Sequence, residues 1–88
     1  MKPILFSAHA LQQLALRGAS EEEVRTAIRE GEPLPAREGR MSFRKNFPYR
    51  AAWKGKLYDV KQVMPIVIEE TEALVVVTVY VFYFGGES

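Results

Sequence analysis

The sequence contains no cysteine and only one histidine, His9, among its 88 residues. Without cysteine the chain has no disulfide framework, no thiol nucleophile and no Cys-based zinc site. A metal held by one histidine needs two or three carboxylates converging from elsewhere, so we expect no metal site. A glycine-rich phosphate loop is missing as well, and we expect no cofactor.

Long apolar runs are also missing. The longest, residues 74–84, is shorter than the roughly 20 residues of a membrane-spanning helix. The first residues are not followed by the apolar stretch of a signal peptide, so the expected location is the cytoplasm, with no membrane span. Hydrophobic residues make up 48% of the chain, which is enough for it to fold, and its length predicts a single domain over residues 1–88.

The charges are distributed unevenly along the chain. Residues 37–61 hold eight of the twelve basic side chains and two acidic ones, whereas the other residues hold four basic and nine acidic ones. Clustered Lys and Arg attract polyanions and neutralise phosphates, whatever the net charge of the protein. This basic segment therefore predicts a nucleic acid or an acidic protein as the partner.

The first part of the chain predicts a helical hairpin over residues 7–31. Ser7 can cap the first helix, Gly18 can end it, and Ser20–Glu23 has the form of a capping box at the start of the second helix. Residues 32–35 contain two prolines, which lack amide donors, so we interpret this stretch as a linker.

After the linker the hydrophobic period changes to two, which predicts a sheet over residues 37–84. Asn46, Phe47 and Pro48 are expected to turn the chain inside a basic hairpin. Pro65 predicts an edge position or a bulge, and the apolar last strand is typical of a central strand covered on both sides. The expected strands are residues 40–45, 49–54, 57–69 and 74–84, with residues 2–6 as a candidate fifth. The fold class is thus α+β, with the helical hairpin packed on a four- or five-stranded antiparallel sheet.

Two groups of residues suggest chemistry. His9 would lie at the start of a helix, where the helix dipole favours the neutral imidazole of a general base; the alternative is a merely exposed histidine. Basic and aromatic residues alternate on the predicted strands, a mixture that commonly binds single-stranded RNA through phosphate contacts and base stacking. The alternative is a solvated cationic face that protects a sheet edge. The expected RNA-binding residues on these strands are Arg40, Lys45, Arg50, Trp53 and Lys54.

Several segments resemble an uncharacterised family of small bacterial domains. They are Phe6-Ser7-Ala8-His9-Ala10, Arg17-Gly18-Ala19-Ser20-Glu21-Glu22-Glu23-Val24, Ala27-Ile28, Gly31 and Val77-Thr78-Val79-Tyr80. That family is similar to the barnase, colicin and RelE-type ribonuclease fold. The resemblance implies a metal-independent ribonuclease or the toxin of a toxin–antitoxin pair, with RNA, including ribosome-associated RNA, and an antitoxin protein as partners. The catalytic residues it implies are His9, Arg44 and Thr78, to which we add the neighbouring hydroxyl of Tyr80. The same motif adds Arg17 to the expected RNA-binding residues.

Three functional hypotheses follow. In the first, His9 is the base or acid of RNA cleavage, Arg44 holds the phosphate, and Thr78 or Tyr80 positions it. In the second, the basic sheet binds nucleic acid or an acidic partner without catalysis. In the third, the apolar last strand forms a homodimer, which would support the small core of so short a chain.

Overall fold

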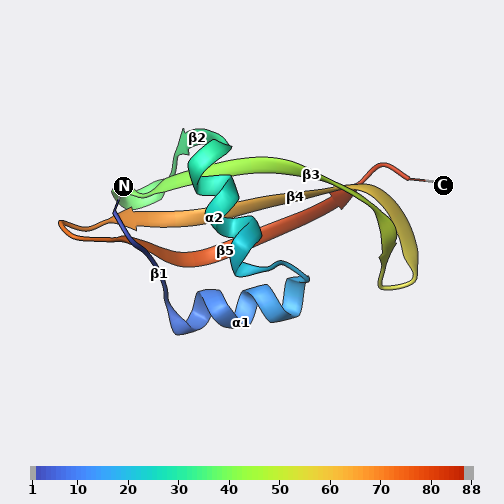
Figure 1. Cartoon of the computed structure of the whole chain (residues 1–88), viewed down its shortest axis with the longest axis horizontal. Coiled ribbons are helices and arrows are strands. Elements are labelled where there is room, and N and C mark those ends of the chain that lie inside the picture. Colours follow the sequence, from blue (N-terminus) through green and yellow to red (C-terminus); the bar gives the residue numbers. More distant parts are fainter. Residues whose placement is uncertain (1, 87–88) are drawn as a thin grey trace.

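Two helices lie on one side of a five-stranded sheet in the computed structural model, which describes residues 2–86 (Figure 1). The class is α+β with the helices before most of the sheet, as the sequence predicts. Among residues 2–86, no helix has the length and apolar character needed to cross a membrane. The elements in chain order are β1 (Ile4–Phe6), α1 (Ala8–Arg17), α2 (Glu21–Glu30), β2 (Glu32–Pro35), the 3-10 turn η1 (Arg37–Gly39), β3 (Met41–Trp53), β4 (Lys56–Glu69) and β5 (Leu74–Phe84).

The sheet is mixed, with strand order β1-β5-β4-β3-β2. The candidate fifth strand at the N-terminus exists as β1, but it runs parallel to β5, while the other neighbours are antiparallel. The prediction of a wholly antiparallel sheet is therefore wrong at this edge. Parallel neighbours need a long connection between them, and here the helices and three strands provide it.

The helix ends form as predicted. The Ser7 hydroxyl accepts a hydrogen bond from the Ala10 amide at 3.0 Å, and the capping box between Ser20 and Glu23 is complete. Gly18 ends α1 in the left-handed region, with φ of 76°, and a Cβ atom there would lie 2.6 Å from the Trp53 ring. Glycine is thus required at position 18 both for the backbone conformation and for the close approach of the indole.

The predicted basic hairpin around Asn46–Phe47–Pro48 is wrong. β3 runs unbroken through these residues and pairs with β4, and the only irregularity is a register shift between Pro48 and Ala51, where Arg50 has φ of 47°. A bulge tolerates a proline because the ladder of hydrogen bonds is already interrupted there. The chain reverses instead at Lys54 and Gly55, whose φ values of 51° and 82° suit a tight two-residue hairpin turn.

The predicted linker is also wrong, because residues 32–35 form β2, which pairs with β3 at the edge of the sheet. The prolines remove amide donors from this edge strand, where proline is tolerated. Pro65 lies in the interior strand β4, and the register against β5 shifts between Ile66 and Val67. The sequence predicts either a bulge or an edge position at Pro65. The structure has the bulge, and β4 is not an edge strand.

The core lies between the helices and one face of the sheet. It contains small and branched side chains, and the largest fully buried ones are five valines and Pro65, with no aromatic residue among them. A core of this volume leaves an 88-residue domain only modestly stable. The apolar core is formed by Ala10, Leu14, Val24, Ile28, Val63, Val67, Val76 and Val79.

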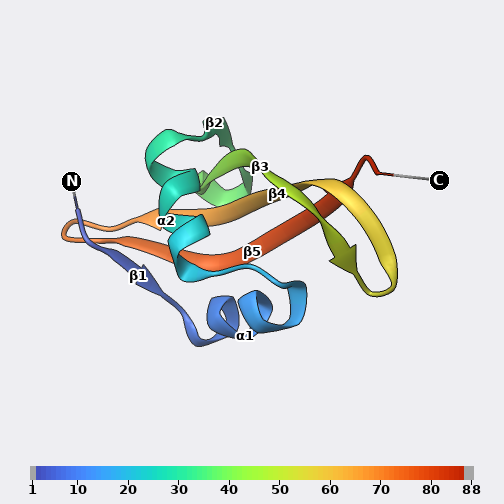
Figure 2. The same ribbon diagram turned by 45° about the vertical axis from the view of Figure 1, so that its right-hand side comes forward.

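The opposite face of the sheet carries no helix (Figures 1 and 2). Tyr80, Phe82 and Phe84 alternate along β5 on this side and are 41%, 45% and 42% exposed. The prediction that the last strand is covered on both sides is wrong, because both helices pack on the face that contains Val76 and Val79. We call the uncovered side the open face, and its residues on β1, β4 and β5 are Leu5, Val60, Gln62, Met64, Ile66, Ile68, Val75, Thr78, Tyr80, Phe82 and Phe84.

Candidate nucleic-acid interface

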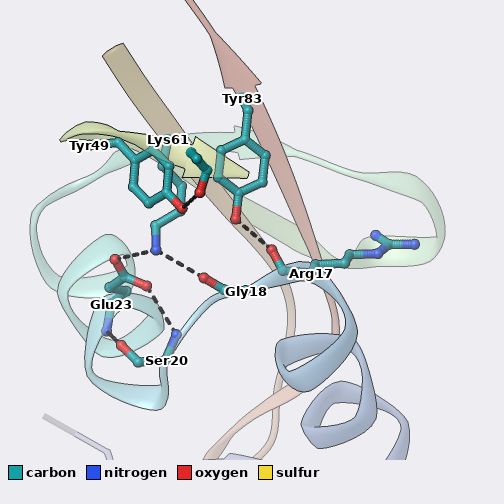
Figure 3. Close-up of polar contacts among 8 residues, drawn as sticks. Arg17, Gly18, Ser20, Glu23, Tyr49, Lys61 and Tyr83 are labelled. Carbon is teal, nitrogen blue, oxygen red and sulfur yellow. Dashed lines mark hydrogen bonds and ion pairs between the residues drawn. The ribbon is translucent and has the colours of Figure 1, made fainter. Parts of the chain in front are cut away.

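A buried polar cluster joins the sheet to the loop between α1 and α2 (Figure 3). The ammonium group of Lys61 is 2.8 Å from Glu23 Oε2 and donates a hydrogen bond to the carbonyl oxygen of Gly18 at 3.0 Å. It also lies 5.3 Å from the centre of the Tyr49 ring. Because Lys61 is only 7% exposed, its charge is satisfied inside the protein and is not offered to a ligand.

Tyr83 forms the second part of this cluster. Its hydroxyl donates to the carbonyl oxygen of Arg17 at 2.7 Å, and its ring stacks on Trp53 with centroids 4.9 Å apart. Burial, with smaller contributions from Tyr49 and Glu23, raises the pKa of Tyr83 to about 12. The phenol therefore stays neutral and keeps donating its hydrogen bond, which holds the curled end of the β3–β4 hairpin against the end of α1.

Folding cancels much of the charge asymmetry of the sequence. Three cations of the basic segment pair with acidic residues that precede it, and a fourth pairs within the segment. Most of these pairs are exposed, so each contributes little stability, but each lowers the local positive potential. The four pairs are Lys61–Glu23, Lys45–Glu30, Arg44–Glu32 and Arg40–Glu38.

The remaining cations of the segment gather mainly at one place. Within residues 2–86, Arg37, Arg50, Lys54 and Lys56 have no carboxylate within ion-pair distance. Three of them lie in residues 50–56, which we call the hairpin tip. There the Lys54 ammonium is 5.5 Å from the Trp53 ring centre, and Lys56 is at the same distance from the Tyr58 ring. The tip thus combines unpaired positive charge with aromatic rings.

A depression of about 530 Å³ adjoins the tip at the β3 bulge. Its volume is in the range of pockets that hold small organic ligands. Arg50 contributes to its wall, and the positive φ of this residue is a consequence of the bulge. An unpaired guanidinium is therefore placed beside a hollow of suitable size for one base or sugar. The lining residues are Asn46, Phe47, Pro48, Arg50, Asp59 and Val60.

The four residues predicted to be catalytic do not gather at one site. His9 is exposed on α1, which packs beside β5, whereas Arg44 pairs with Glu32 at the β2–β3 edge of the sheet. Thr78 and Tyr80 alternate with the buried Val79 and so lie on the open face, away from the helix layer that contains His9.

Two predicted site residues do meet at the edge of β5. The Arg17 guanidinium donates to the carbonyl oxygen of Val79 at 3.0 Å and lies 5.2 Å from the centre of the Tyr80 ring. Among the predicted RNA-binding residues, Arg50, Trp53 and Lys54 cluster at the hairpin tip. Arg40 and Lys45 are instead engaged in ion pairs elsewhere on the sheet.

Sequence reasoning missed three features of this region. It grouped Lys61 with the surface cations, although Lys61 shares its strand parity with the apolar Val63 and Val67, a signal that it faces the helices. It explained Glu23 only as a capping residue, and it did not include Lys56 in the binding set. The ion pair between Glu23 and Lys61 depends on tertiary packing, so no local pattern indicates it.

Comparison with known proteins yields no match to a family model, a curated protein or a solved structure.

Proposed function

We propose that the protein is a non-catalytic module that binds single-stranded RNA through the hairpin tip and the adjoining depression. The observation that carries this proposal is the concentration of unpaired cations at the tip, namely Arg50, Lys54 and Lys56, beside the aromatic rings of Trp53 and Tyr58. Lys and Arg bind phosphates, and a hollow beside them can accept an unstacked base, which single strands provide and duplexes do not.

The expected affinity is modest and depends on salt. If each of the three cations neutralises one phosphate of a single strand, the logarithm of the binding constant falls with a slope of roughly −2 against the logarithm of salt concentration. Between 50 and 200 mM salt, this slope corresponds to a loss of about 20-fold in affinity. RNA is preferred to DNA in this proposal on the strength of the resemblance to the RelE-type ribonuclease fold alone.

Cleavage is less well supported than binding. General acid–base catalysis needs His9 within hydrogen-bond reach of the ribose hydroxyl while a cation holds the neighbouring phosphate. His9 lies near the start of α1, eight residues before Arg17, and no unpaired cation of the hairpin tip is on that helix. A toxin role with an antitoxin partner depends on RNA cleavage, so the cleavage assay tests both.

The test is fluorescence anisotropy with a labelled 12-nucleotide RNA of mixed sequence, single-stranded or annealed to its complement. The variant Arg50→Gln/Lys54→Gln/Lys56→Gln should bind the single strand at least tenfold more weakly than the wild type. A control of equal charge loss, Lys2→Gln/Arg25→Gln/Arg29→Gln, should retain most of the affinity. Equal losses in both variants, or no binding by the wild type, would refute the proposal. RNA fragments formed in EDTA by the wild type but not by His9→Ala would establish cleavage instead.

A further inference from the structure

The open face is uncovered, whereas both edges of the sheet are protected over part of their length. At one edge, Pro33 and Pro35 in β2 deprive an incoming strand of amide donors. At the other edge, β1 pairs with the start of β5, after which the Ser7 hydroxyl donates to Val77 O and Arg17 donates to Val79 O. Pairing of edges between chains is thus obstructed along β2 and along residues 74–79 of β5, and the open face is the larger surface left for association.

The open face is apolar in its centre and charged at its rim. The register places side chains of β4 and β5 in five cross-strand pairs, and none of these ten residues is Lys, Arg, Asp or Glu. Charged side chains flank these pairs: Arg44, which pairs with Glu32, on the β3 side, and Arg17, which stacks on Tyr80, on the β5 side. Arg50 and Asp59 line the same depression as Val60. An apolar centre with a polar rim is the usual anatomy of a protein–protein interface. The pairs are Ile68–Val75, Ile66–Thr78, Met64–Tyr80, Gln62–Phe82 and Val60–Phe84.

The absence of cations in these five pairs argues against RNA as the occupant, because phosphates would remain without partners. The size of the face agrees with a protein occupant. Three strands, β3, β4 and β5, spaced about 4.8 Å apart over five pairs spaced about 7 Å apart, give a projected area on the order of 500 Å², and the three residues of β1 extend it at one end. This area is close to the lower end of what each partner buries in a specific protein complex, roughly 600 to 1,000 Å².

The two ends of the open face are complementary to each other. The side chains at one end are large and aromatic, namely Tyr80, Phe82 and Phe84. Those at the other end, Val75 and Ile68, are smaller and aliphatic. A two-fold axis through the central Met64–Tyr80 pair would place the aromatic end of one copy on the aliphatic end of the other, and every contact would occur twice. Large side chains opposite small ones are what close packing of two sheets requires.

We propose that a second copy of this chain covers the open face and forms a two-fold dimer with the sheets packed face to face. The occupant is a second copy because the face complements itself and requires no partner charge. This inference is argued from residues outside the hairpin tip, although the Val60–Phe84 pair adjoins the proposed RNA site because Val60 also lines the depression. The dimer would carry one tip at each end and so hold two RNA sites.

Sedimentation equilibrium between 1 and 200 μM tests this proposal. The wild type should reach twice the chain mass of 10.0 kDa, whereas Phe82→Glu should stay at the mass of one chain. Leu16→Glu is the matched control, because Leu16 is 66% exposed on α1 and lies outside the open face, so it should leave the dimer intact. Circular dichroism melts verify that each variant is folded. A wild type that remains at one chain mass throughout, or a Phe82→Glu dimer, overturns the proposal.

A charge-swap pair tests the two-fold geometry. Phe84→Glu and Val75→Lys should each dissociate the dimer, because each places a charge against an apolar patch of the other copy. Mixed in equal amounts they should form a heterodimer, since an axis along the Met64–Tyr80 pair stacks β5 on β5 and brings position 84 of one copy against position 75 of the other. Failure of the mixture to associate, while the wild type dimerises, would refute this arrangement. If the wild type stays at the mass of one chain and Phe82→Glu loses RNA affinity, the open face binds RNA and not a second copy.

Discussion

Lys61 and Lys56 lie on the same strand of the same basic segment, yet they do different things. Lys61 is buried against Glu23 and holds the helical loop to the sheet, whereas Lys56 stands at the hairpin tip beside Tyr58 with no carboxylate within ion-pair distance among residues 2–86. The buried polar cluster and the hairpin tip thus show that basic residues of one segment can have different roles. A cation that already has a partner supports the fold, and one without a partner remains available to a ligand.

Removal of Lys61 should separate the stability of the buried polar cluster from that of the hairpin tip most strongly. Lys61→Met leaves the Glu23 carboxylate, whose side chain is only 24% exposed, without its partner, and we expect a loss of about 2 to 3 kcal/mol in the free energy of unfolding. Lys56→Met, the control at the tip, should change it by less than about 0.5 kcal/mol. Urea denaturation measures both values. Adding Glu23→Gln to Lys61→Met should recover part of the loss, and equal effects at positions 61 and 56 would contradict the distinction.

The buried cluster also depends on Gly18. Gly18→Ala forces a side chain into a left-handed backbone and against the Trp53 ring, so we expect a loss of about 2 kcal/mol in unfolding free energy. Gly39 provides the matched control, because its φ of 74° is nearly the same but a Cβ atom there would meet nothing within 4 Å. Gly39→Ala should lose only about 1 kcal/mol. If both variants lose the same amount, the Trp53 contact has no energetic role.

Local patterns predicted the parts of this fold that local physics determines. The Ser7 cap, the capping box at Ser20 and the glycine stop at position 18 depend on neighbouring residues, and all are present. The prolines predict a turn at Pro48 and a linker at Pro33, and both predictions are wrong. Pro48 lies beside a bulge within β3, and Pro33 lies within the edge strand β2. Whether a strand tolerates a proline depends on which strand pairs with it, and the local sequence does not show that pairing.

The candidate site was predicted only in part for the same reason. Clustering of Arg50, Trp53 and Lys54 follows from their closeness in sequence at a hairpin. The ion pairs of Arg40 and Lys45, and the separation of His9 from Arg44 by the sheet, follow from strand order and helix placement. Sequence charge counts cannot reveal which cations are already paired.

The hairpin tip should dominate the salt dependence of RNA binding. Lys54→Gln/Lys56→Gln removes two phosphate contacts, so the slope of log binding constant against log salt should become less negative by about 1.4. Lys2→Gln/Arg29→Gln removes the same charge from other elements and should leave the slope nearly unchanged. Anisotropy titrations at four salt concentrations provide the slopes. If the slope of the control variant becomes less negative by as much as that of the tip variant, RNA binding responds to net charge alone.

The smallest expected effect concerns Tyr83, which connects the buried cluster to the tip through Trp53. Since its pKa is about 12 in the folded protein and 10.0 is the ordinary value, its contribution to stability is complete below pH 10 and is lost as the pH rises toward 12. The urea midpoint of the wild type should therefore fall more steeply above pH 10 than that of Tyr83→Phe, although the variant starts lower because it lacks the hydrogen bond to Arg17. Lysines titrate in the same range in both proteins, so the difference between the two curves isolates Tyr83. Parallel curves, or tyrosinate absorbance at 295 nm showing all four tyrosines ionising together near pH 10, would contradict the assignment.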